Sequence, residues 1–135
     1  SPYTRCHNYT HVGLNKSMDR HAEDTLVGIL VEGKEGIENL PEIVQVEGID
    51  LIYLGMYDIS QSINLPGQLE HPDVLTQLVK CLKIIKSSGK FAGTFSRDVK
   101  TCKSYKNMGF DFIAYVADSF ALTSFYQKFN QDINR

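Results

Sequence analysis

The chain has 135 residues, of which 42% are hydrophobic and 22% charged, so it can form one domain with one core and lacks the composition of a disordered chain. Its net charge of −2 gives no basic surface for nucleic acid, and no apolar run reaches the roughly 20 residues that span a bilayer. Three widely spaced cysteines without a CxxC pair are typical of reduced thiols in a cytoplasmic protein. We therefore expect one cytoplasmic domain over residues 1–135, with neither nucleic acid nor membrane as a partner.

The first part of the chain predicts a loop, a short helix and a buried strand. Residues 1–16 are polar and contain turn-forming residues. Ser17 is a suitable N-cap for a helix over residues 18–24. Residues 25–31 are almost continuously apolar, which is typical of a parallel strand covered on both faces.

The next segment predicts a helical connection and a second strand. Hydrophobic residues recur at helical spacing over residues 34–46, but Pro41 lies inside the pattern. The segment therefore forms either two short turns or a helix that begins at Pro41, where proline is tolerated. Residues 49–54 predict the second strand, and residues 55–71 predict a long loop of the kind that often carries function.

The remainder predicts two further strand–helix units. A helix over residues 72–88 leads to a strand over residues 90–95. The helix should bury one stripe of side chains: Val74, Leu78, Cys81, Leu82 and Ile85. A third helix over residues 98–108 and a strand over residues 111–116 follow. The last helix, over residues 119–130, is rich in aromatic residues. Alternating strands and helices imply a parallel sheet with right-handed crossovers.

Two carboxylates occupy the carboxyl ends of the first two strands. Glu32 ends the first strand, and Asp58 lies shortly after the second. Parallel α/β folds place their chemistry at this edge, and two carboxylates brought together there suit a hard divalent cation. The alternative is that both are surface residues at strand ends, one of them capping a helix.

The residues around both carboxylates resemble the HpcH/HpaI aldolase family. Its fifth strand ends in a pattern such as I-E-T before E-A-V-E-N-L, and residues 30–40 read L-V-E-G-K-E-G-I-E-N-L. Its sixth strand ends G-P-x-D-L-S, and residues 55–60 read G-M-Y-D-I-S. The loop G-x-P-G-x-x-x-H-P is similar to N-L-P-G-Q-L-E-H-P at residues 64–72. The resemblance implies a TIM (β/α)8 barrel, with this chain corresponding to strands five to eight and their helices.

The resemblance also implies a site and a reaction. Glu32 and Asp58 would be the ligands of a divalent metal, Mg²⁺ or Mn²⁺, with Co²⁺ also possible. Backbone groups of Gly55, Met56, Tyr57 and Asp58 would receive the carboxylate of a small 2-oxo acid. The reaction would be retro-aldol cleavage of a 4-hydroxy-2-oxo acid to pyruvate and an aldehyde. Two departures from the family pattern stand beside these residues: methionine replaces proline at position 56, and glycine replaces threonine at position 33.

The family's catalytic Arg and its His–Asp acid/base pair have no match in this chain, so these groups are expected outside it. Arg5, His7 and His11 precede the matching strands and more simply belong to a surface or to the rim of the site. His71 is expected to shape the junction between loop and helix, and Asp118 to cap the last helix.

Two other functions remain open. One is a citryl- or malyl-CoA lyase-like activity, which uses the same two carboxylates. The other is a non-catalytic half barrel or assembly module. The aromatic last helix and an open sheet edge imply a homo-oligomer or association with a missing N-terminal half, although a contact within the core would also account for the helix.

Overall fold

The computed structural model describes residues 25–134, which form four strands, each followed by one or two helices. The strands lie in chain order, and every neighbouring pair is parallel. They are β1 (Gly28–Val31), β2 (Leu51–Leu54), β3 (Phe91–Ser96) and β4 (Phe112–Tyr115). The helices are α2 (Gly33–Glu38), α3 (Leu40–Ile43), α4 (Met56–Ser62), α5 (Pro72–Ser87), α6 (Val99–Met108) and α7 (Asp118–Ile133). The expected strand–helix alternation and parallel sheet are confirmed.

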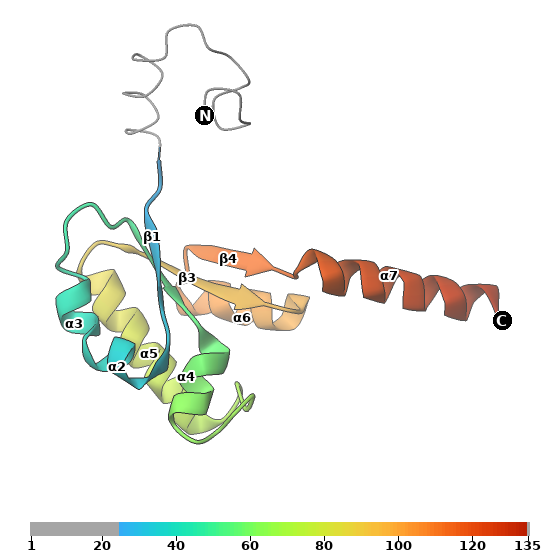
Figure 1. The fold of residues 1–135 in the computed structure, drawn as a ribbon, viewed down its shortest axis with the longest axis horizontal. Coiled ribbons are helices and arrows are strands. Elements are labelled where there is room, and N and C mark those ends of the chain that lie inside the picture. The colour runs from blue at the N-terminus through green and yellow to red at the C-terminus, as the bar shows by residue number, and fades with distance from the viewer. Residues whose placement is uncertain (1–24, 135) are drawn as a thin grey trace, which may run out of the picture.

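One face of the sheet forms the core together with the helices that pack on it. Figure 1 shows α2, α3, α4 and α5 grouped on one side of the strands. Ile52, Leu54 and Ala92 point into this layer and are fully buried. The predicted stripe of α5 meets them, and all of its members are buried: Val74, Leu78, Cys81, Leu82 and Ile85. Helical spacing in the sequence therefore identified the core face of the longest helix in this layer.

The opposite face of the sheet is apolar and has no cover among residues 25–134. Leu30 pairs with Tyr53, Tyr53 with Gly93, and Gly93 with Phe112, so these four residues form one row across the sheet. Leu30 is 54% exposed and Phe112 is 45% exposed. In a closed eight-stranded barrel this face would line the packed interior.

The connections that follow β1 and β2 each contain two helices. The segment after β1 forms two helices, α2 and α3, with Pro41 at the second position of α3, which confirms the alternative of two short turns. The loop predicted over residues 55–71 is wrong at its start, where α4 occupies Met56–Ser62. A helix of two turns shows too few repeats for hydrophobic spacing to reveal it. The predicted helix over residues 18–24 and its cap lie outside the described residues.

Helix α7 leads away from the sheet (Figure 1), and none of its residues is buried. Within residues 25–134, the alternative of a core contact for this helix is therefore wrong. Asp118 is the first helical residue rather than the N-cap, which is Ala117, but its carboxylate accepts a hydrogen bond from the Ser119 N–H at 2.7 Å. No helix in the described range, α7 included, is long and apolar enough to cross a membrane.

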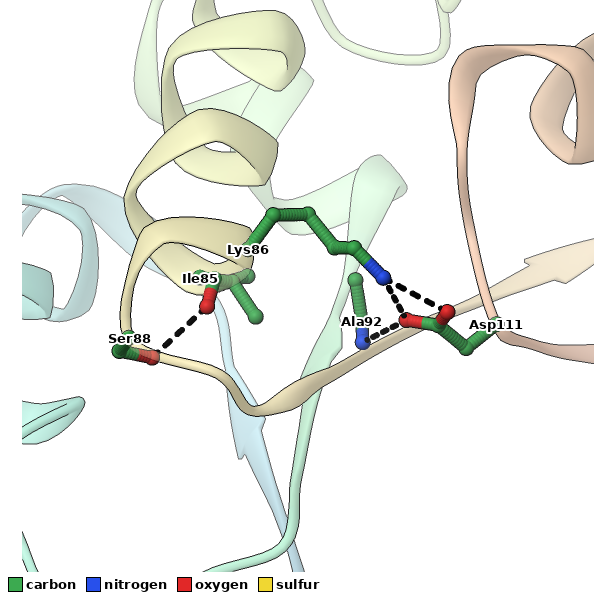
Figure 2. A network of polar contacts seen from close by, with 5 residues as sticks. All are labelled: Ile85, Lys86, Ser88, Ala92 and Asp111. Carbon is green, nitrogen blue, oxygen red and sulfur yellow. Dashed lines mark hydrogen bonds and ion pairs between the residues drawn. The ribbon is translucent and has the colours of Figure 1, made fainter.

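A polar network ties α5 to the amino ends of β3 and β4 (Figure 2). The Lys86 ammonium donates to both carboxylate oxygens of Asp111, at 2.7 and 2.8 Å. The same carboxylate accepts a hydrogen bond from the Ala92 N–H at 2.9 Å. This network lies at the edge of the sheet opposite Glu32 and Asp58, so it supports the fold from the other end of the strands.

Candidate functional site

Glu32 and Asp58 lie at the same carboxyl edge of the sheet. Glu32 directly follows β1, and Asp58 is the third residue of α4, which begins two residues after β2. Val31 and Leu54 are register partners, so the two strands end at the same level. The Gly55 N–H then donates to the Val31 carbonyl at 3.0 Å, which holds the turn after β2 against the end of β1.

The two carboxylates converge beside Gly55. A Cβ atom placed on Gly55 would lie 3.1 Å from Glu32 Oε2 and 3.4 Å from Asp58 Oδ2. Gly55 has φ −80°, which other residues adopt freely, so the backbone does not require glycine there. The absence of a side chain at residue 55 leaves room for the side chains of Glu32 and Asp58 to approach each other, since an added Cβ would also lie 3.0 Å from the Glu32 Cβ. Two carboxylates placed in this way suit a divalent cation.

The turn after Glu32 does require glycine. Gly33 has φ +72°, a left-handed conformation that costs other residues roughly 1–2 kcal/mol. The chain therefore turns sharply out of β1 into α2 immediately after Glu32. Glycine therefore stands where the family has threonine, at a position whose left-handed backbone conformation favours glycine.

The start of α4 is fixed by burial and by one buried hydroxyl. Met56, which replaces the family's proline, is 3% exposed and belongs to the core. The Ser60 Oγ donates to the Tyr57 carbonyl at 2.6 Å and accepts from the Gly67 N–H at 3.0 Å. Ser60 thus joins the first turn of α4 to the loop that follows the helix. Sequence reasoning gave Ser60 no role, although it ends the motif at residues 55–60.

The described residues supply two ligands for a cation, not a complete set. Within residues 25–134, no group of three His, Cys, Asp or Glu side chains is close enough to hold a metal ion. Two protein ligands suit Mg²⁺ or Mn²⁺, which retain water and bind oxygen atoms of a substrate. His71 lies at the N-cap of α5, where its Nδ1 accepts from the Asp73 N–H at 3.2 Å, which confirms its expected junction role. Arg5, His7 and His11 lie outside the described residues.

A family comparison accounts for this arrangement. The model of the HpcH/HpaI aldolase/citrate lyase family matches residues 5–124, nearly the whole chain. The chain belongs to the HpcH/HpaI aldolase/citrate lyase family. The resemblance read from residues 30–40, 55–60 and 64–72 is confirmed.

Named relatives of this HpcH/HpaI chain are aldolases. It is 35% identical over 94 residues to the hydroxypyruvate/pyruvate aldolase of Roseobacter denitrificans, covering 70% of this chain and 37% of the relative. It is 31% identical over 110 residues to the 2-keto-3-deoxy-L-rhamnonate aldolase of Salmonella paratyphi B, covering 82% of this chain and 41% of the relative. The chain therefore spans about two fifths of the length of these curated relatives.

Solved structures of the same family show the same fold. An HpcH/HpaI aldolase/citrate lyase family protein of Burkholderia cenocepacia matches with a TM-score of 0.78 at 24% identity, over 100% of this chain and 52% of its own. An HpcH/HpaI aldolase of Desulfitobacterium hafniense matches with a TM-score of 0.81 at 21% identity, over 95% of this chain and 50% of its own. The expected α/β architecture of the TIM-barrel type is confirmed.

Proposed function

We propose that this chain provides the metal-binding part of a carbon–carbon lyase that cleaves a 4-hydroxy-2-oxo acid to pyruvate and an aldehyde. The observation that carries the proposal is the convergence of Glu32 and Asp58 on the space beside Gly55. The position of this space at the carboxyl edge of a parallel sheet supports an active site there. The names of the aldolase relatives support the reaction class.

The donor set fits a hard divalent cation. Glu32 and Asp58 offer carboxylate oxygens from two separate elements, with space between them and no other described side chain to complete the coordination. Glu32 and Asp58 would hold Mg²⁺ or Mn²⁺, with Co²⁺ as a further candidate. Such an ion, when bound, polarises the carbonyl of a 2-oxo acid and stabilises the enolate that forms as the carbon–carbon bond breaks.

The first turn of α4 would hold the carboxylate of the oxo acid. The N–H groups of Met56, Tyr57 and Asp58 belong to the first residues of a helix, which have no acceptor within it. These groups can donate to an anion beside the metal ligands. The N–H of Gly55 already donates to the Val31 carbonyl, so Gly55 would not donate to the substrate carboxylate. Its contribution would be the absence of a side chain beside Glu32 and Asp58.

Acid/base groups for the reaction are expected from outside residues 25–134. The histidine in this range, His71, is occupied at the N-cap of α5. We therefore assign binding of metal and oxo acid to this chain and proton transfer to another segment. A domain over residues 1–135 that forms the C-terminal half of a barrel fits this division.

The proposal is tested by calorimetry of Mn²⁺ binding with and without pyruvate. We expect pyruvate to strengthen Mn²⁺ binding in the wild-type chain, and Glu32→Gln and Asp58→Asn each to abolish the effect. Glu35→Gln is the matched control, since Glu35 lies on α2 in the turn after Glu32 and is exposed. Unchanged binding in either site variant, or no binding to a folded wild-type chain, would overturn the proposal and favour the non-catalytic assembly module.

The same measurement with an acyl-CoA thioester separates the lyase alternatives. A citryl- or malyl-CoA lyase-like protein would bind the thioester in competition with pyruvate. A 4-hydroxy-2-oxo acid lyase would bind pyruvate alone. We expect the second result.

A further inference from the structure

A cavity of about 680 Å³ lies between the loop that follows α4 and helix α6. Its volume falls within the range of sites that bind small molecules. Glu32, Gly55 and Asp58 do not line this cavity, so it is separate from the candidate metal site.

The walls of the cavity are apolar and the charges at its rim are paired. Leu69, Leu75 and Met108 line it, and each packs against the core while remaining partly exposed. At the rim, the Lys100 ammonium lies 3.7 Å from a Glu70 carboxylate oxygen, and both side chains are 87% exposed. Because these two charges face each other, the rim carries no net charge. Apolar walls under a neutral rim suit a ligand that is mainly apolar and uncharged.

Tyr105 brings one polar group without a partner into this cavity. The residue lines the cavity and is only 3% exposed, and its ring centroid lies 5.5 Å from that of Phe110. Within residues 25–134, no hydrogen bond joins the Tyr105 hydroxyl to another group. The hydroxyl is not sealed inside the protein, because every enclosed side-chain oxygen or nitrogen in this range has a hydrogen-bond partner. It therefore opens into the cavity, where a buried phenol without a partner favours a ligand that supplies one.

The surroundings of Tyr105 decide which kind of partner fits. Burial raises the pKa of the Tyr105 phenol, and the neighbouring Tyr57 raises it further. The carboxylates of Asp98 and Glu70 act in the same direction. At neutral pH the phenol keeps its proton and can donate it in a hydrogen bond. The same two carboxylates disfavour an anion beside the hydroxyl, so the acceptor that fits is an uncharged oxygen.

We propose that this cavity binds a small uncharged molecule with an apolar body and one carbonyl or hydroxyl oxygen, which accepts a hydrogen bond from Tyr105. The apolar body contacts Leu69, Leu75 and Met108. Binding here requires neither a metal ion nor a 2-oxo acid, so the inference stands apart from the proposed function.

Acetophenone and benzoate are matched probes for this site, because they share a phenyl ring and differ in the charge of the oxygen-bearing group. We expect acetophenone to shift the amide resonances of Gly67, Gln68 and Ser104, which line the cavity, in ¹H–¹⁵N spectra. It should bind at least about tenfold more tightly than benzoate. Pyruvate with Mn²⁺ should not displace it. Absence of these shifts in a folded chain, equal binding of benzoate, or displacement by pyruvate would overturn the proposal.

Two variants test the hydrogen bond and the cavity separately. Tyr105→Phe keeps the ring and removes the hydroxyl, so the affinity for acetophenone should fall by about fivefold, the size of one neutral hydrogen bond. Tyr126→Phe is its control, since Tyr126 lies on α7, is 59% exposed and does not line the cavity.

Ser104→Trp places an indole in the cavity and should abolish binding of acetophenone. Ser104 is exposed on α6, so its replacement should leave the melting temperature close to that of the wild type. Unchanged affinity in Tyr105→Phe or in Ser104→Trp would overturn the proposal, as would an equal loss of affinity in Tyr126→Phe.

Discussion

Glu32 Oε2 and Asp58 Oδ2 lie 3.1 and 3.4 Å from the position that a Cβ atom of residue 55 would occupy. Gly55→Ala therefore places a methyl group between the two carboxylates without straining the backbone. We expect the Mn²⁺ affinity to fall by at least about tenfold, which corresponds to about 1.4 kcal/mol. Calorimetry measures the affinity, and the melting temperature should stay within a few degrees of wild type.

The control for this variant is Gly36→Ala. The added Cβ would there face Val31 Cγ1 at 3.2 Å and would meet neither carboxylate. We expect Mn²⁺ affinity to be retained. An equal loss of affinity in both variants would show that the effect of Gly55→Ala comes from general destabilisation.

Ser60 and Ser62 offer a matched pair on α4. The buried Ser60 hydroxyl bonds both the Tyr57 carbonyl and the Gly67 N–H, whereas the Ser62 hydroxyl bonds only Ile59 in the preceding turn. Ser60→Ala leaves two polar groups without this partner, so we expect it to lower the free energy of unfolding by about 1–3 kcal/mol. It should also weaken pyruvate binding, because the turn around Tyr57 loses its attachment to the loop. Ser62→Ala should change neither quantity, and equal effects in urea titrations would contradict this role for Ser60.

The main elements of the fold could be predicted because their signals are long and local. Helix α5 has 16 residues with apolar side chains at helical spacing, and all five predicted core positions are buried. The strands appear as apolar runs, although β1 begins at Gly28 rather than at residue 25. Helix α4 escaped prediction because its seven residues provide only three buried side chains, one of them polar.

The arrangement of the candidate site was predictable in part. The rule that parallel strands end at one edge was enough to place Glu32 beside Asp58. The role of Ser60 depends on a contact with Gly67, seven residues away, and hydrophobic spacing carries no information about such a contact.

The exposed apolar residues of α7 predict association with other chains. Phe125 and Phe129 are 64% and 50% exposed, and no residue of this helix is buried. We expect Phe125→Asp combined with Phe129→Asp to shift the wild-type chain from a self-associated species to a monomer in sedimentation velocity. Gln127→Asp, which adds charge to the same helix without removing apolar surface, should leave association unchanged. A monomeric wild-type chain would contradict self-association and favour a separate N-terminal half as the partner.

Asp111 predicts a dependence of stability on pH. Partial burial disfavours its charged form, but the hydrogen bonds from Lys86 and Ala92 outweigh this cost, so the pKa of Asp111 is lowered. A carboxyl whose pKa is lower in the folded state stabilises the protein above its unfolded pKa of about 3.9 and loses that contribution as the pH falls through the folded value. We expect Asp111→Asn to lower the free energy of unfolding by about 1–2 kcal/mol at pH 7.

The same contribution should disappear in acid. Because wild-type Asp111 becomes protonated as the pH falls through its lowered pKa, the difference between wild type and Asp111→Asn should shrink in acid. Lys86→Met should produce a similar loss at pH 7, and the double variant should lose less than the sum of the two, because both residues belong to one network (Figure 2). Asp132→Asn on α7 is the control, since Asp132 is exposed and distant from this network. Urea titrations at several pH values measure all four proteins, and a difference that stays constant from pH 7 to pH 3 would contradict the assignment of the pH dependence to Asp111.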